Sequence, residues 1–108
     1  MYRIIYTKQA VKDIKKLKSC GLDKKARELI EIMKKNPFQN PPAYEKLVGN
    51  LQGYCSRRIN IQHRIVFQVI EEANTHEGID YEGYVKIIRM WTQYERRYPS
   101  DEMIVLIE

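Results

Sequence analysis

The residues best suited to chemistry gather in one stretch, from Tyr44 to Gln68. Within it the carboxylate of Glu45 precedes a run of cationic or potentially cationic residues, which comprises Arg57, Arg58, His63 and Arg64. A carboxylate can take a proton as a general base, and a guanidinium can bind and neutralise an anion. The combination indicates acid–base chemistry on an anionic substrate.

Two segments around these cations alternate as strands do, Leu51–Ile61 and Arg64–Ile70, with Asn60–His63 as the connection of an antiparallel pair. Successive side chains of a strand point to opposite faces, so the neighbours Arg57 and Arg58 cannot point the same way. At least one of them must face outward or line a groove. By the same alternation His63 faces away if Arg64 faces the site, and we expect a turn or packing histidine.

The remaining elements follow from periodicity and from helix start and stop signals. We expect a strand at Tyr2–Tyr6, a helix at Lys8–Ser19 capped by Thr7 and ended by Gly21, a helix at Asp23–Lys35, an exposed insertion at Glu71–Gly83 and a central strand at Tyr84–Trp91. The order β-α-α-β-β-β, with a possible extra C-terminal strand in the closing MIVLIE, predicts an α+β fold. One mainly antiparallel sheet of about 4–5 strands would carry the N-terminal two-helix hairpin on one face. We expect a single domain over residues 1–108, with 97–108 as a C-terminal extension.

Charge is distributed unevenly along the chain. Residues 1–70 hold 15 Lys/Arg and 5 Asp/Glu, whereas residues 71–108 hold 4 and 9. The basic part favours a polyanionic partner, because lysine and arginine displace counterions from phosphates. No apolar run reaches the ~18 residues of a membrane helix, and the first residues lack the pattern of a signal peptide. We therefore expect a cytoplasmic protein.

The sequence shows no pattern of metal ligands. Cys20 and Cys55 are not spaced as ligands, and there is no HExxH, no CxxC and no carboxylate cluster. We expect two free thiols, no metal and no cofactor.

RNA can be cleaved without a metal if a base activates the neighbouring 2′-hydroxyl, a cation steadies the phosphate and an acid protonates the leaving 5′-oxygen.

Four short motifs, in order, carry a family resemblance: P-x-Y-E-K-L from Pro42, N-L-x-G-Y from Asn50, S-R-R-I-N from Ser56 and H-R-I-V-F from His63. This order resembles the YoeB/Txe branch of the RelE superfamily of bacterial toxin ribonucleases. The resemblance covers roughly residues 2–94 and implies a RelE-like fold.

The resemblance also implies the roles of individual residues. Glu45 matches the family's general base, and Arg64 matches its phosphate-binding arginine. The alternative reading of this pair is a structural salt bridge. The candidate RNA-binding residues are Arg57, Arg58, Lys46 and Tyr54. The sequence leaves open which of the two arginines touches RNA.

The chain departs from the family near its last expected strand. A histidine followed by a tyrosine completes the family's active site, whereas this chain has Gln93 followed by Tyr94. Glutamine cannot donate a proton to a leaving group near neutral pH. Our hypothesis is that Gln93, natural or introduced by substitution, marks an attenuated enzyme unless Tyr94 acts as the acid.

The function implied by the resemblance is that of the toxin in a type II toxin–antitoxin pair. Such a toxin is a ribosome-dependent endoribonuclease that cuts mRNA in the ribosomal A site and inhibits translation. A cognate YefM/Axe-like antitoxin would neutralise it, and a homodimer is possible within the family. Three alternatives remain: a ParE-like toxin that inhibits gyrase, a non-catalytic RNA- or ribosome-binding module, and a small basic domain with ordinary surface charges.

Overall fold

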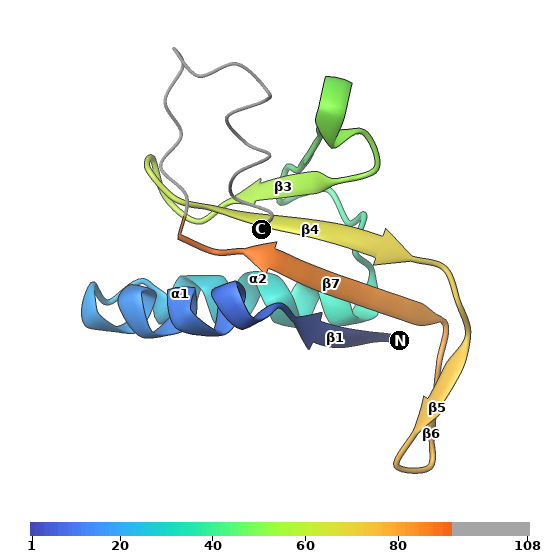
Figure 1. Cartoon of the computed structure of the whole chain (residues 1–108). Helices are drawn as coiled ribbons and strands as arrows, with labels where there is room; N and C mark the ends of the chain where they lie inside the picture. Colours follow the sequence, from blue (N-terminus) through green and yellow to red (C-terminus); the bar gives the residue numbers. More distant parts are fainter. Residues whose placement is uncertain (92–108) are drawn as a thin grey trace.

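The computed structural model of the chain describes residues 1–91. Its elements, in chain order, are β1 (Tyr2–Tyr6), α1 (Lys8–Ser19), α2 (Asp23–Lys35), β2 (Glu45–Lys46), the 3-10 helix η1 (Gly49–Leu51), β3 (Cys55–Arg58), β4 (Arg64–Ile70), β5 (Asn74–His76), β6 (Ile79–Tyr81) and β7 (Gly83–Arg89). Five strands form one sheet in the order β1-β7-β4-β3-β2, in which only the β1–β7 pair is parallel. Both helices lie on one face of this sheet (Figure 1). The predicted α+β fold, with its mainly antiparallel sheet and N-terminal helical hairpin, is confirmed.

The first helix begins and ends where the sequence predicts. Thr7 Oγ1 accepts a hydrogen bond from the amide of Ala10 at 3.0 Å, and its hydroxyl donates to the Ile88 carbonyl at 2.8 Å. Thr7 therefore caps α1 and also attaches it to the end of β7. At the other end Gly21 has a φ of 74°, and the Leu22 amide bonds the Leu17 carbonyl at 2.9 Å. This left-handed turn is the usual way in which a glycine ends a helix.

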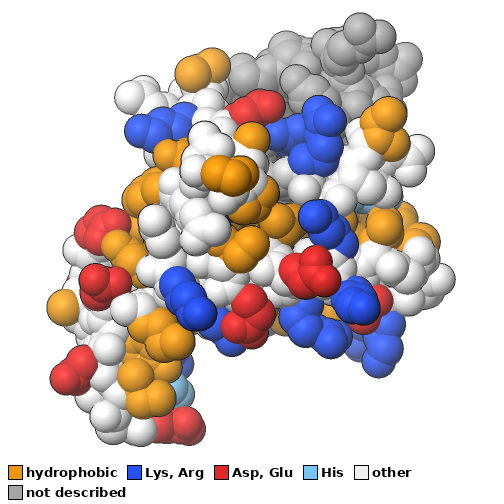
Figure 2. Space-filling view, turned by 180° about the vertical axis from the view of Figure 1, so that it is seen from behind, with side chains coloured by type: hydrophobic (Ala, Val, Ile, Leu, Met, Phe, Trp, Pro, Cys, Tyr) orange, Lys and Arg blue, Asp and Glu red, His pale blue; other side chains and the backbone are white. Residues whose placement is uncertain are grey.

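The acidic insertion is a β-hairpin, and most of its residues are exposed, as the sequence predicted. Strands β5 and β6 pair around a turn at Glu77 and Gly78, whose φ angles are 51° and 78°. The hairpin projects from the sheet (Figure 1), and acidic side chains mark it at the lower left of Figure 2. Contacts with the first two residues of the chain attach its base: the Glu82 amide bonds the Met1 carbonyl at 2.8 Å, the Glu82 carboxylate pairs with the Met1 amino group at 2.9 Å, and the Tyr2 hydroxyl donates to the Glu71 carboxylate at 2.9 Å.

Strand β3 is shorter than predicted. The sequence suggested a strand over Leu51–Ile61, but η1 and a turn at Gly53, with a φ of 98°, occupy its first part. The following turn is held by Asn60, whose side-chain oxygen accepts from the amides of Gln62 and His63. All four residues left as strand pair with β4, and Cys55 and Ser56 also pair with β2. The possible C-terminal strand predicted at residues 103–108 lies outside the described residues.

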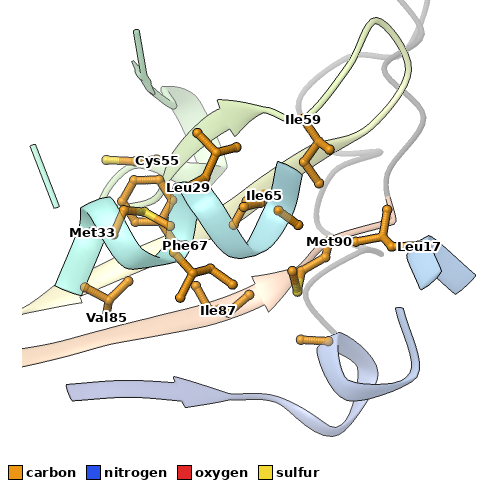
Figure 3. Packing of buried hydrophobic residues seen from close by; sticks show 13 residues of the cluster. Leu17, Leu29, Met33, Cys55, Ile59, Ile65, Phe67, Val85, Ile87 and Met90 are labelled. Carbon is orange, nitrogen blue, oxygen red and sulfur yellow. The ribbon is translucent and has the colours of Figure 1, made fainter. Parts of the chain in front are cut away.

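The core fills the space between the helices and the sheet (Figure 3). Its buried members from the helices are Ala10, Leu17, Ala26, Leu29, Ile30 and Met33, and those from the sheet and its connections are Cys55, Ile59, Ile65, Phe67, Val85, Ile87 and Met90. Cys55, Ile65 and Phe67 therefore define the helix-facing side of β3 and β4. The opposite side of these strands is called the open face below. No helix within residues 1–91 is long and apolar enough to cross a bilayer.

A fully buried carboxylate ties α1 to the end of β7. Asp13 accepts hydrogen bonds from Arg89 Nε at 2.8 Å and from the amides of Met90 and Trp91 at 3.0 and 3.2 Å. It lies on the apolar stripe of α1, between Ala10 and Leu17, where water cannot replace a lost partner. A buried charge of this kind is tolerated because it is paired and fully hydrogen-bonded. Asp13 thus fixes the position at which the chain leaves the sheet.

Replacing Asp13 with alanine should lower the free energy of unfolding by about 3 kcal/mol, because it leaves the half-buried guanidinium of Arg89 and two amides without their acceptor. Urea denaturation measures this loss. The control is Asp23→Ala, which removes an acid paired with the exposed Arg27 at 3.4 Å and should cost at most about 0.5 kcal/mol. Equal losses in the two variants would contradict the role assigned to Asp13.

The two thiols should differ in reactivity. Cys55 is buried and Cys20 is exposed, and both are free. Burial raises the pKa of the Cys55 thiol above its ordinary value, although Lys46 and Arg57 act in the opposite direction. Since the thiolate is the reactive form, Cys55 carries less of it at any given pH. At pH 8 iodoacetamide should label Cys20 at least about tenfold faster than Cys55, as peptide mass spectrometry would show; equal rates would contradict this burial.

Candidate functional site

The pairing of three strands places four polar residues on the open face. In the antiparallel register Glu45 lies opposite Ser56, and Arg58 lies opposite Arg64. Directly opposite residues share a face of the sheet, as do residues two apart in one strand. Glu45, Ser56, Arg58 and Arg64 therefore lie on the same side, away from the helices. These four are called the open-face cluster below.

The centre of the cluster is an ion pair between Glu45 and Arg64. Arg64 Nη2 lies 3.2 Å from Glu45 Oε1, and Arg64 Nε donates to Ser56 Oγ at 3.0 Å. The side chain of Arg64 is only 8% exposed, whereas that of Glu45 is 61% exposed. The cation is thus fixed in the sheet and the carboxylate is open to solvent. Such a pair can bind an anionic group at the arginine and accept a proton at the carboxylate.

The structure separates Arg57 from Arg58. Arg58 is exposed on the open face, beside Arg64, and is available to an anionic ligand. Arg57 faces the helices, is 0% exposed, and donates to the carbonyls of Pro37, Gln39 and Pro42 at 2.7–2.9 Å. Of the two candidate arginines the structure therefore leaves Arg58 facing outward, whereas the guanidinium of Arg57 is enclosed and occupied by backbone acceptors. That either residue binds RNA stays a prediction.

Lys46 and Tyr54 do not belong to the open-face cluster. Lys46 follows Glu45 in β2 and so points to the opposite side of the strand. Together with Tyr54 it lines a groove of about 580 Å³, whose apolar walls include Phe38 and Val48. The predicted RNA-binding residues thus divide between two sides of the sheet edge. Whether this groove takes part in RNA binding stays a prediction.

The last predicted site residues, Gln93 and Tyr94, lie outside the described residues. The structure does show how the chain approaches them, because Asp13 binds the amides of Met90 and Trp91. Trp91 is half-buried and stacks on His63, with ring centroids 4.0 Å apart. His63 is itself buried. The prediction of a packing histidine is confirmed.

Two residues important to this arrangement were missed at the level of sequence. Ser56 orients Arg64, and the signal for it was its position two residues before Arg58 in an alternating segment. Asp13 was hidden among the lysines of α1, although it interrupts an apolar stripe that runs from Ala10 to Leu17. An acid in such a stripe is seldom buried unless it has a partner.

Metal-binding chemistry has no evident place in the part of the chain that the structure describes. Among residues 1–91, no three His, Cys, Asp or Glu side chains lie together in a way that could hold a metal ion. The chemical groups of the open-face cluster are a carboxylate, a hydroxyl and two guanidinium groups.

Comparison with known proteins gives consistent matches. A family model described as a YoeB-like toxin of bacterial type II toxin–antitoxin systems matches residues 4–81. The toxin YoeB of Escherichia coli K12 is 40% identical over 50 residues, which are 46% of this chain and 60% of that protein. A solved YoeB/ParE toxin from Agrobacterium tumefaciens has a TM-score of 0.67 and 26% identity, covering 85% of this chain and 99% of that chain. A YoeB-YefM complex from Staphylococcus aureus has a TM-score of 0.64 and 30% identity, covering 87% and 99%.

The matches differ in how much of each protein they cover, and this coverage decides what they show. The chain spans only about 60% of the length of the curated YoeB toxin from E. coli. The family model, in contrast, covers most of this chain and includes every member of the open-face cluster. The expectation drawn from the order of the motifs is confirmed at the level of the family. The chain belongs to the YoeB-like toxins of bacterial type II toxin–antitoxin systems.

Proposed function

We propose that this chain is an endoribonuclease that cuts mRNA in the ribosomal A site and thereby inhibits translation in the cytoplasm. The observation that carries the proposal is the open-face cluster, in which an exposed carboxylate contacts a buried guanidinium at 3.2 Å. A second, exposed guanidinium lies beside them, that of Arg58. Membership of the YoeB-like toxins supports the same reaction class.

The proposed reaction uses the RNA's own 2′-hydroxyl as nucleophile. Glu45 removes the 2′-proton, the 2′-oxygen bonds to phosphorus, and the bond from phosphorus to the 5′-oxygen breaks. Arg64 and Arg58 neutralise the charge that develops on the phosphate oxygens. A proton must reach the leaving 5′-oxygen, and Tyr94 or water supplies it in a chain that has Gln93 rather than histidine. The products are a 2′,3′-cyclic phosphate and a 5′-hydroxyl.

The proposed partner that controls the toxin is an antitoxin of the YefM/Axe type. The S. aureus relative was solved in complex with YefM. Residues 1–70, which include the open-face cluster, carry a strong positive charge, with 15 Lys/Arg against 5 Asp/Glu. An acidic antitoxin segment would be attracted to that charge and would compete with RNA for it.

The decisive test is cleavage of mRNA in a purified translation system, with and without ribosomes. Glu45→Ala should reduce ribosome-dependent cleavage at least about 100-fold, because it removes the general base. The matched control is Glu28→Ala, which removes an exposed carboxylate from α2 and should leave the rate unchanged. Primer extension would locate and quantify the cuts.

Two results of the cleavage assay would contradict this proposal, and each would point to a different conclusion. Folded protein that makes no cuts, even as Gln93→His, would eliminate the ribonuclease proposal and make inhibition of gyrase the next assay. Cleavage that persists in Glu45→Ala would assign the base to another residue.

Gln93→His should raise the cleavage rate on the order of 10²-fold or more, because it supplies a general acid for the leaving oxygen. The acid must be protonated, so the gain should shrink as pH rises above about 6.5. Single-turnover rates between pH 5.5 and 8.5 measure both effects. Gln62→His, which adds an imidazole to an exposed turn, is the control, and an unchanged rate for Gln93→His would contradict the attenuation hypothesis.

A further inference from the structure

The segment that delivers Glu45 to the sheet has few means of holding its own shape. Residues 37–44 run from the end of α2 to β2 and include three prolines, which have no amide proton to donate. Its backbone bonding is local, as in the hydrogen bond from the Gln39 amide to the Asn36 carbonyl at 3.1 Å. Strand β2 that follows is only two residues long and lies at the edge of the sheet. The position of Glu45 must therefore depend on contacts from another element.

Arg57 supplies those contacts from β3. Its Nη1 donates to the Pro42 carbonyl at 2.7 Å, and its Nη2 donates to the carbonyls of Pro37 and Gln39 at 2.7 and 2.9 Å. The guanidinium also lies over the ring of Tyr44, 5.1 Å from its centroid. A single side chain thus binds the segment at its beginning, its middle and its end. The last contact is with the residue that directly precedes Glu45.

The chemistry of this contact requires a guanidinium. Within residues 1–91 no carboxylate pairs with Arg57, so the positive charge is balanced by three carbonyl dipoles and by the faces of Tyr44 and Phe67. The fully buried position lowers the pKa of Arg57 through desolvation, while Tyr44 and Cys55 oppose that shift. Arginine stays charged even so, and its planar fork can reach several acceptors at once. A lysine ammonium could not reach all three carbonyls from one point.

We propose that Arg57 is a positioning residue, which holds residues 37–44 so that the Glu45 carboxylate lies against Arg64 on the open face. The inference rests on the proposed role of Glu45 in cleavage. It assigns to Arg57 no contact with RNA, because the side chain faces the helices and is buried. The two neighbouring arginines of β3 then serve one site from opposite faces of the sheet. Arg58 faces the ligand, and Arg57 fixes the segment that carries the base.

The experiment compares Arg57→Lys and Arg57→Met with the unmodified chain. Lysine keeps the charge without the fork, and methionine keeps an unbranched stem without the charge. Both should lower kcat of ribosome-dependent cleavage by about 10- to 100-fold, since displacement of a catalytic group by about 1 Å has that effect. KM should change less than about threefold, because the groups that bind the phosphate are intact.

Hydrogen exchange provides a readout that does not depend on activity. In both variants the amides of Gln39 and Leu47, which bond the carbonyls of Asn36 and Tyr54 at 3.1 and 2.9 Å, should exchange at least about tenfold faster. The amides of Phe67 and Ile87 should keep their protection. The control variant is Met33→Ala, which creates a cavity in the core beneath the sheet. It should speed exchange throughout the sheet and leave kcat per folded molecule unchanged.

Several outcomes would overturn the proposal. Exchange that accelerates equally across the sheet would show that Arg57 only stabilises the fold. Full activity in Arg57→Lys would show that charge alone suffices, and local loosening with unchanged kcat would show that the segment does not position Glu45. If neither the unmodified chain nor Gln93→His cuts RNA, the ribonuclease proposal fails by itself, and the exchange data still decide whether Arg57 holds the segment before Glu45.

Discussion

The site depends on the pairing of one four-residue strand with both of its neighbours. Strand β3 places Ser56 opposite Glu45 on one side and Arg58 opposite Arg64 on the other. A shift of either pair by one residue would turn its side chains to the opposite face, because the repeat of a strand is two residues. The buried Cys55, Ile65 and Phe67 make such a shift costly, since it would expose apolar surface to water. Packing against the helices therefore fixes the register, and the register assembles the open-face cluster.

Two buried charged side chains fix the irregular segments at the edges of the site, which strand pairing does not hold. Arg57 binds three carbonyls of the segment that enters β2, and Asp13 binds two amides of the segment that leaves β7. Each charge makes up for hydrogen bonds that regular pairing does not provide at that point. Polar groups buried without partners are costly, so each segment has a strong preference for its observed position. In this small protein the core positions the strands, and the buried charges position the chain between them.

The sequence predicted the elements and the centre of the site better than it predicted the roles of individual arginines. Helical periodicity and caps gave α1 and α2 with their observed bounds, and the motif order led to Glu45 and Arg64. Alternation showed that Arg57 and Arg58 must differ, but it could not tell which one is buried. Every second residue of Cys55–Arg58 belongs to one face, and each of the two faces carries an arginine, so neither is recognisable as the apolar one. The acceptors that enclose Arg57 come from a segment 15 to 20 residues away in the sequence. A contact between backbone carbonyls and a distant side chain produces no periodic pattern in the sequence, so periodicity could not reveal it.

The unequal exposure of Glu45 and Arg64 suits the order of events in the proposed reaction. Arg64 is held by Ser56 and lies within the sheet, so its guanidinium has a fixed position. Glu45 is largely exposed, and within residues 1–91 the contact of its side chain with Arg64 is its one ion pair, so it can change partners. A phosphate that arrives at Arg64 competes with Glu45 for the guanidinium. The carboxylate displaced in this way would be released beside the bound nucleotide, where it could accept the proton of the 2′-hydroxyl. The substrate would then convert a resting ion pair into a separate base and phosphate-binding group.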